Sequence, residues 1–299
     1  MRVRIQEQEI PFPLTTIRGR LRLSGLTDIP ISQILTGFQK IQSNNKIPTE
    51  AGLAKFVEDA LNSYSPQIIK NYETLNAYEH LRGISDEIPP IILALEGASA
   101  TGKSMIAINL VQDLASTRFI STDTVRQFLR GIYTKKDHPE LYCHTYQAFK
   151  HKQSGSSSLD SVVRGYIAQC ELISPPVIDM VRRIHEEGAV TVAEGVHLQP
   201  GSINHLSKGT LEILINPNEE SHKAMFASKY AAGKLKSVSK NSITREEEFQ
   251  STRKIQNYMI VEAKKHNLSI IDLESYEDTR SEISELVIDK IEQIIGDQE

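Results

Sequence analysis

The stretch LALEGASATGKSMIAIN, residues 93–109, is the most informative part of this sequence about its fold. It begins with an apolar run typical of a buried strand, continues with small residues, and resumes at Met105 with apolar residues at helical spacing. Residues 97–104 within it match the pattern GxxxxGK[ST], in which a glycine-containing loop joins a strand to a helix. The stretch therefore predicts a strand, a phosphate-binding loop and a helix, in that order.

Each residue type in this loop has a mechanical reason to be there. Gly97 and Gly102 allow backbone angles and close approaches that a Cβ atom would prevent, and the following helix directs its partly positive N-terminus at an anion. Lys103 would reach the β and γ phosphates of a nucleoside triphosphate, and Ser104 would bind magnesium. A plain glycine turn is the alternative, which the flanking strand and helix disfavour. The predicted phosphate contacts are Gly97, Ala98, Ser99, Ala100, Thr101, Gly102, Lys103 and Ser104.

The composition is that of a globular enzyme. The chain has 299 residues, of which 39% are hydrophobic and 24% charged, enough for one large or two ordinary domains. The cysteines, Cys143 and Cys170, form neither a disulfide framework nor a CxxC metal pattern, so we expect a reducing compartment, the cytoplasm. The sequence predicts structural thiols.

The charge and hydropathy pattern limits the classes of binding partner that we expect. No apolar run approaches the ~20 residues needed to span a bilayer, and residues 1–10 lack the apolar core of a signal peptide. We therefore expect no membrane partner. A net charge of −4 argues against nucleic acid as the main partner and favours a small anionic molecule. The oligomeric state has no signal in the sequence.

A polar joint that ends in prolines, SDEIPP at 85–90, predicts a boundary between domains at 1–88 and 89–299. The first domain should be small and mostly helical, with a strand at 1–5 and helices at 31–42 and 49–64, the second capped by Thr49. In the second domain strands alternate with helices, which predicts an α/β fold with a doubly wound parallel sheet. Its predicted strands are 91–96, 118–121, 189–193 and 210–215, and its first predicted helices are 103–116 and 123–131.

Asp123 and Arg126 follow the second predicted strand, in STDTVRQFLRG at 121–131. Ligands of open parallel sheets bind where the strands end. There the carboxylate could orient or deprotonate an acceptor hydroxyl and the arginine could bind a phosphate. A plain N-cap for Asp123 and a solvated helix charge for Arg126 are the alternatives.

Two more candidate positions follow. Glu194 ends the strand in AVTVAEGVHLQPG, residues 189–201, where a carboxylate can hold magnesium-bound water. His197 in the same stretch could contact substrate or hydrogen-bond a loop. A basic segment could close over the phosphates, although each of its lysines alone would fit a solvated helix surface. These lysines are Lys223, Lys229, Lys234, Lys236 and Lys240.

The ordered set of motifs resembles the archaeal 2-phosphoglycerate kinases over most of residues 90–275. The motifs are GASATGKS, ISTDTVRQFLRG, EGVHLQPG and the late EEFQSTRKIQNYMIVEAKKHNLSIID at 247–272. The phosphate loop is shared with many NTPases, whereas the order of all four motifs is more particular. Residues 9–26 resemble the start of an ATP-cone, a small helical nucleotide-binding module, so the resemblance implies a P-loop kinase domain preceded by an ATP-cone-like domain.

The resemblance implies an ATP-dependent kinase that requires Mg²⁺. In it the 3-hydroxyl of 2-phosphoglycerate attacks the γ-phosphate of ATP and gives 2,3-bisphosphoglycerate. Lys103 would serve the β and γ phosphates, while Ser104 and Glu194 would surround magnesium. Asp123 would serve the attacking hydroxyl, and Arg126 the carboxylate or phosphate of the acceptor.

The resemblance adds further candidates on the acceptor side. Arg253 in TRKIQ is one of them, beside His197. Residues 139–150, with His144 and Tyr146, are assigned to the acceptor side on the resemblance alone. Two alternatives stay open: a kinase for another small acceptor such as a nucleoside or sugar, and a nonenzymatic ATP-responsive regulator.

Overall fold

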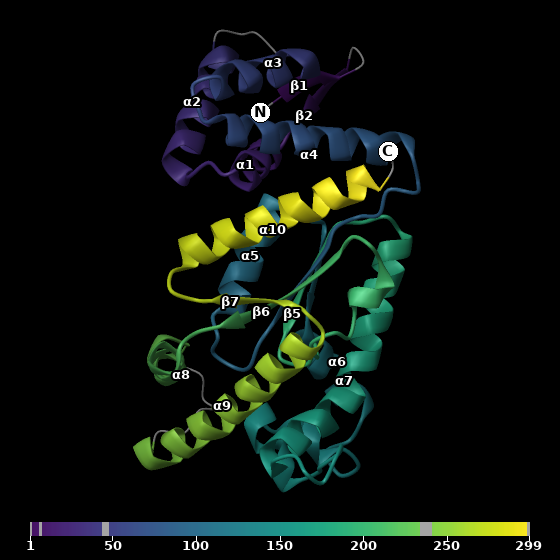
Figure 1. Ribbon diagram of the computed structural model, residues 1–299, viewed down its shortest axis with the longest axis vertical. Helices are drawn as coiled ribbons and strands as arrows, with labels where there is room; N and C mark the ends of the chain where they lie inside the picture. Colours follow the sequence, from purple (N-terminus) through teal and green to yellow (C-terminus); the bar gives the residue numbers. More distant parts are fainter. Residues whose placement is uncertain (1, 6–7, 44–47, 234–240, 298–299) are drawn as a thin grey trace. The chain divides into compact units, whose positions relative to one another are not determined.

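The computed structural model describes residues 2–5, 8–43, 48–233 and 241–297 (Figure 1). The chain divides into two compact units. The first unit contains Met1–Pro89, Asn109–Ser116 and Arg280–Glu299, and the second contains Pro90–Ile108 and Thr117–Thr279.

The first unit is mostly helical. Its strands β1 (Arg2–Ile5) and β2 (Gln8–Pro11) pair antiparallel. The predicted strand at 1–5 and the predicted helices at 31–42 and 49–64 are confirmed, and Thr49 caps its helix by accepting a hydrogen bond of 3.1 Å from the N–H of Gly52. The helices of this unit are α1 (Leu14–Leu23), α2 (Asp28–Ser43), α3 (Glu50–Leu61), α4 (Pro66–Ile84) and most of α10 (Tyr276–Gly296).

Apolar residues from β1 and the first helices form the core of this unit. Val3, Leu21 and Ile31 are completely buried in it, and Phe38 stacks at a tilt against Phe56 with 4.4 Å between ring centroids. Burial of such side chains contributes roughly 2 kcal/mol each. The core explains why α1 to α3 carry apolar residues at helical spacing.

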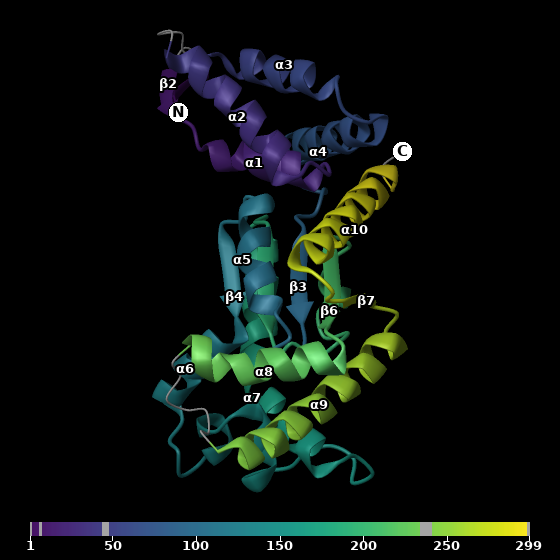
Figure 2. The ribbon, with the colours of Figure 1, turned by 90° about the vertical axis from the view of Figure 1, so that its left-hand side faces the viewer.

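The second unit contains a parallel sheet with the strand order β4-β5-β3-β6-β7 among the described residues. The sheet prediction and four of its strands are confirmed, whereas the fifth strand, β7, was missed. The non-consecutive order places the strand before the phosphate loop in the centre of the sheet (Figures 1 and 2). The strands are β3 (Ile92–Glu96), β4 (Arg118–Ser121), β5 (Thr191–Gly195), β6 (Thr210–Asn216) and β7 (Ser269–Asp272).

Both faces of the sheet are covered. On one face Ile92 and Ala94 of β3 join a core with Ile173 and Val177 of α7 (Ser161–Glu186), to which α6 (Thr122–Ile132) also contributes. Side chains alternate between the faces of a strand, so Leu93 lies on the other face, where it is also completely buried. Burial on both faces explains the uninterrupted apolar run before the loop and confirms the doubly wound fold.

The helices α8 (Glu219–Gly233) and α9 (Ser242–Lys265) lie beyond the carboxyl ends of the strands (Figure 2). They contact each other, and Phe226 and Phe249 lie with 5.9 Å between ring centroids. Of the lysines predicted to form a lid, Lys223 forms an ion pair of 2.9 Å with Glu246. Lys234, Lys236 and Lys240, and the side chain of Lys229, lie outside what the structure describes.

Within the described part of the chain, no helix combines the length and the apolar character needed to cross a membrane. Neither cysteine is in a disulfide, and Cys170 is buried while Cys143 is partly exposed.

Candidate active site

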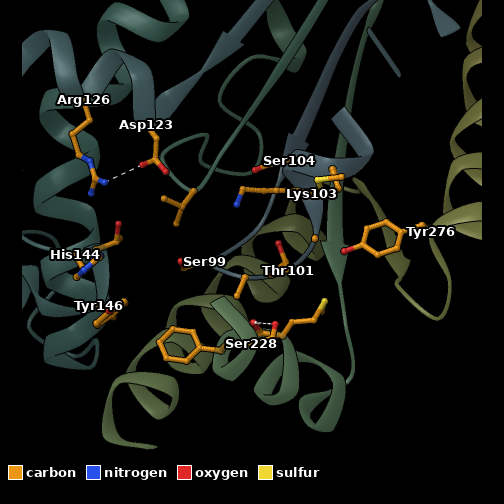
Figure 3. A pocket seen from close by; sticks show the side chains of 17 residues that line it. Ser99, Thr101, Lys103, Ser104, Asp123, Arg126, His144, Tyr146, Ser228 and Tyr276 are labelled. Carbon is orange, nitrogen blue, oxygen red and sulfur yellow. Dashed lines mark hydrogen bonds and ion pairs between the residues drawn. The ribbon is translucent and has the colours of Figure 1, made fainter. Parts of the chain in front are cut away.

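A pocket of about 460 Å³ lies at the carboxyl ends of the strands in the second unit (Figure 3). The phosphate loop forms its floor, and the start of α6, the segment around His144, and α8 form its walls. In Figure 3, Asp123, Arg126, His144 and Tyr146 lie on one side of the loop and Tyr276 on the other. The fold thus brings the loop together with Asp123 and Arg126, which follow β4, in one cavity. This agrees with the expectation that the carboxyl ends of parallel strands meet at one edge of the sheet.

The loop has an unusual backbone conformation at Gly97 and Ala100. Gly97 has a φ of +145°, and a Cβ atom there would lie 3.1 Å from the carbonyl oxygen of Ile215 and 2.8 Å from Oγ1 of Thr101. Ala100 has a φ of +69°, a left-handed conformation uncommon for a residue other than glycine. Such strain persists only where surrounding contacts hold it, and it is frequent in ligand-binding loops.

Lys103 lies over this loop and is only 8% exposed. Its ammonium donates a hydrogen bond of 3.2 Å to the carbonyl oxygen of Ala98, which also accepts one of 3.2 Å from the hydroxyl of Thr101. A phosphate bound in the loop would offer the ammonium an anionic acceptor, and hydrogen bonds between ions are about twice as strong as neutral ones. Lys103 is therefore placed to exchange a carbonyl for a phosphate.

Ser104 and Glu194, the predicted magnesium residues, are in contact. The hydroxyl of Ser104 donates a hydrogen bond of 2.9 Å to Oε2 of Glu194, and the hydroxyl of Ser121 donates one of 2.7 Å to Oε1. A hydroxyl and a carboxylate supply the oxygen ligands that Mg²⁺ prefers, and Mg²⁺ usually takes the remainder from water and phosphate. This donor set fits Mg²⁺, while the described residues contain no group of three or more His, Cys, Asp or Glu side chains that could hold a metal alone.

Asp123 and Arg126 form an ion pair of 3.1 Å across one turn of α6. The carboxylate is 68% exposed, whereas the arginine side chain is 12% exposed and also donates a hydrogen bond of 3.3 Å to the carbonyl oxygen of Cys143. Ser121 occupies the N-cap position of α6, and Asp123 lies in its first turn, so the plain N-cap interpretation of Asp123 is wrong. Both side chains line the pocket.

His197 does not line the pocket, because it is completely buried behind it. Its Nε2 lies 3.0 Å from Oε1 of Gln169, an acceptor only, so we assign the proton to Nε2 and let Nδ1 accept from the hydroxyl of Thr122 at 3.3 Å. Burial, followed by the charge of Arg126, lowers the pKa of His197 to about 3. The imidazole is neutral at physiological pH and orders the residues behind the pocket.

Gly195 is the second position where the fold requires glycine. It has a φ of +150°, and a Cβ atom there would lie 1.8 Å from Oγ1 of Thr122. The close approach of β5 to the start of α6 is what brings Glu194 next to Ser121 and Ser104. The glycine after the predicted magnesium residue therefore serves the site geometry.

His144 and Tyr146 form the wall opposite the loop. Their rings are stacked, with 5.0 Å between centroids and an angle of 6° between planes, and Tyr146 also packs edge-on against Phe226 of α8. Burial raises the pKa of Tyr146, so its phenol is neutral. Phe226 and Tyr276 are lining residues that the sequence did not indicate. The signal for Tyr276 was its position just after β7, the strand that was missed.

Arg253 lies outside the set of residues that line the pocket. Its Nη1 donates a hydrogen bond of 3.0 Å to the carbonyl oxygen of Pro217, just after β6. One turn later on α9, Gln256 contacts the phosphate loop itself. The structure therefore brings TRKIQ to the ends of the strands rather than into the cavity.

A buried carboxyl pair lies behind the loop. Glu96, the last residue of β3, and Glu212 of β6 share the sheet face opposite to that of Glu194. Glu212 accepts hydrogen bonds of 2.7 and 2.8 Å from the N–H groups of Gly201 and Ile203. Burial, together with the neighbouring Glu212, raises the pKa of Glu96 well above its usual value. The raised pKa favours the protonated form of Glu96.

The chain is similar in sequence to archaeal proteins named 2-phosphoglycerate kinase. The chain is 29% identical to a 2-phosphoglycerate kinase of Methanopyrus kandleri over 230 residues, which cover 73% of this chain and 67% of that protein. It is 24% identical to a 2-phosphoglycerate kinase of Methanocaldococcus jannaschii over 299 residues, which cover 98% of this chain and 93% of that protein. No family model matches the chain.

Among solved structures, a shikimate kinase of Acinetobacter baumannii superimposes with a TM-score of 0.44 and 12% identity, over 71% of this chain and 97% of that one. A similarity at this level says nothing about the substrate. The archaeal relatives, and the parallel sheet with its phosphate loop, are consistent with the family resemblance that the motifs indicated.

Proposed function

Because the chain is a P-loop kinase related to the archaeal 2-phosphoglycerate kinases, we propose that it transfers the γ-phosphate of ATP to the 3-hydroxyl of 2-phosphoglycerate. The products are ADP and 2,3-bisphosphoglycerate. One observation carries the proposal: Lys103 and Ser104, which suit a triphosphate, line the same pocket as the Asp123–Arg126 ion pair, which suits an anionic alcohol.

The nucleotide would lie on the phosphate loop, residues 97–104. Backbone N–H groups and the N-terminus of α5 (Lys103–Asp113) would bind the phosphates, and Lys103 would neutralise charge on the β and γ groups. Ser104 and Glu194 would hold Mg²⁺ together with phosphate oxygens and water. When bound, Mg²⁺ supplies positive charge that offsets the negative charge of the transferring group.

Asp123 would orient the acceptor hydroxyl. In the transfer, the bond between the γ-phosphorus and the bridging oxygen of ADP breaks, a bond from the acceptor oxygen to phosphorus forms, and the hydroxyl proton passes to the Asp123 carboxylate. Phosphoryl transfer depends mainly on positioning and charge neutralisation, so an exposed carboxylate is sufficient for this role.

Arg126 would bind the phosphate or carboxylate of the acceptor. Its ion pair already aims the guanidinium and the Asp123 carboxylate at the same part of the pocket, and a guanidinium matches either anion with two parallel hydrogen bonds. His197 would act from behind, because it contacts Thr122 beside Asp123 and, at 3.5 Å, Thr145 in the pocket wall. Neutral His197 leaves the positive charge of the acceptor site to Arg126 and Lys103.

The test is ADP release from ATP·Mg²⁺ in the presence of 2-phosphoglycerate, 3-phosphoglycerate, a set of nucleosides, or water alone. We expect saturable stimulation by 2-phosphoglycerate only, and ³¹P NMR should show a bisphosphorylated product. Stimulation by one of the other acceptors instead would reject 2-phosphoglycerate and assign the same site to that acceptor.

Asp123→Asn tests the role of the carboxylate. The amide keeps the size of the side chain but cannot take a proton, so we expect kcat to fall by about 10²- to 10⁴-fold. The dissociation constant of ATP should stay unchanged, because Asp123 faces the acceptor. Asp179→Asn, on the outer surface of α7, is the matched control. Normal turnover of the Asp123 variant would show that the role proposed for this carboxylate is wrong.

A further inference from the structure

Gln256 of α9 joins the phosphate loop to the neighbouring strand. Its side chain is completely buried. Its Oε1 accepts a hydrogen bond of 2.8 Å from the N–H of Ala98, and its Nε2 donates one of 3.0 Å to the carbonyl oxygen of Ile215 on β6. Only a side chain with both a donor and an acceptor at its end can satisfy these two backbone groups together.

A second side chain holds the next residue of the loop. His222 of α8 is completely buried, and its Nε2 donates a hydrogen bond of 2.9 Å to the carbonyl oxygen of Ser99. The ring packs edge-on against Phe249 of α9, with 5.4 Å between centroids. Consecutive residues at the start of the loop are thus held by two adjacent helices.

These contacts act where the loop needs support. Gly97 passes close to the carbonyl oxygen of Ile215, the same group that Gln256 binds, and Ala100 is left-handed. A strained backbone keeps its conformation only when its surroundings over-determine it. The N–H of Ala98 donates to Gln256, so this part of the loop is held by the protein itself.

We infer that Gln256, assisted by His222, is a positioning residue that holds the phosphate loop in the conformation that binds the triphosphate. The inference rests on the proposed nucleotide site and not on the identity of the acceptor. It also gives a role to the TRKIQ segment: Arg253 fixes α9 to the carbonyl oxygen of Pro217, and Gln256, one turn later, reaches the loop.

The test compares Gln256→Met with Gln250→Met in the full chain. Methionine keeps the length and volume of the side chain and removes the two backbone hydrogen bonds, together with a longer one of 3.4 Å from Nε2 to Oδ1 of Asn216. Gln250 lies on the exposed side of the same helix and bonds to Glu246 within it, so its variant is the matched control. Calorimetric titration measures the affinity for ATP·Mg²⁺ and for inorganic tripolyphosphate. Tripolyphosphate has no nucleoside, so its affinity reports on phosphate binding by the loop alone.

We expect Gln256→Met to weaken the binding of ATP and of tripolyphosphate by the same factor, about 10-fold, as the loss of a buried hydrogen-bond partner implies. The KM for ATP should rise by that factor while kcat at saturating ATP changes by less than about threefold. The KM for the acceptor should not change, and Tm should stay within about 3 °C of the wild type.

Gln256→Glu is the conservative rescue. A carboxylate still accepts from Ala98 but repels the carbonyl oxygen of Ile215, whereas the protonated acid reproduces both bonds. Its affinity for tripolyphosphate, relative to that of the wild type, should therefore recover as the pH falls.

Two outcomes would overturn the inference. One is wild-type affinity for tripolyphosphate in Gln256→Met. The other is a parallel loss of ATP binding, acceptor binding and Tm, which would indicate a purely structural side chain. Failure of the wild type to phosphorylate 2-phosphoglycerate would count against the proposed function alone, because the titrations need no acceptor.

Discussion

The two ends of the pocket are built in different ways. The end proposed for the nucleotide is a single continuous loop that would bind through its backbone, and its conformation depends on Gly97, Gly102 and the contacts of Gln256. The end proposed for the acceptor consists of side chains from α6, from the segment around His144, and from α8, which meet only in the folded chain. A backbone site can thus be read from a local motif, whereas a side-chain site depends on the packing of separate segments.

The largest expected effect is at the nucleotide end. Lys103→Ala removes the ammonium that would neutralise the transferring phosphate, and we expect kcat to fall by about 10³-fold or more. Steady-state ADP release at saturating ATP measures it. Lys265→Ala, at the exposed end of α9, is the control and should leave kcat unchanged. If Lys103→Ala kept wild-type turnover, the loop would not be the site of transfer.

For Arg126, at the proposed acceptor end, we expect a smaller effect than for Lys103, mainly on binding. Arg126→Lys keeps the positive charge but loses the two parallel hydrogen bonds, so KM for the acceptor should rise by about 10- to 100-fold, which corresponds to roughly 1.4 to 2.8 kcal/mol. KM for ATP should not change. The control is Arg182→Lys, on the outer surface of α7. A rise in KM for ATP of the same size would show that the two ends are not separate.

The smallest expected effect concerns the support behind the loop. Glu96 stays protonated in the folded chain because its pKa is raised, while in the unfolded chain it ionises near 4.5. Above that pH the native state binds more protons than the unfolded state, so this group lowers stability as pH rises. Glu96→Gln removes the titration. Urea unfolding should therefore find it about as stable as the wild type at pH 4 and more stable at pH 8.

Glu87→Gln, at an exposed position, is the control: it keeps Glu96, so its stability should match that of the wild type at both pH values. Equal destabilisation of Glu96→Gln at both pH values would contradict the assignment of a neutral carboxyl group.

Some features of the structure were not predicted from the sequence. The fifth strand was missed because SIID at 269–272 is short, and because Asn267, whose φ of +54° ends the preceding helix, was not recognised as a helix-end signal. Tyr276 was missed with it. In the sequence His197 fitted either a substrate contact or a loop contact, because one histidine forms no pattern that would distinguish them. The structure places it in a buried network with Gln169 and Thr122.

The strand, the loop and the helix at residues 92–113 followed from the sequence alone, as did a parallel sheet, whereas the central position of the strand came from the structure. The sequence also indicated Asp123 and Glu194, because strand ends in such a sheet face one edge. The hydrogen bond from the N–H of Ala98 to Gln256, 158 residues away, could be found only in the folded chain. A glycine motif imposes backbone angles locally, whereas a hydrogen bond between distant segments depends on how the helices and strands pack.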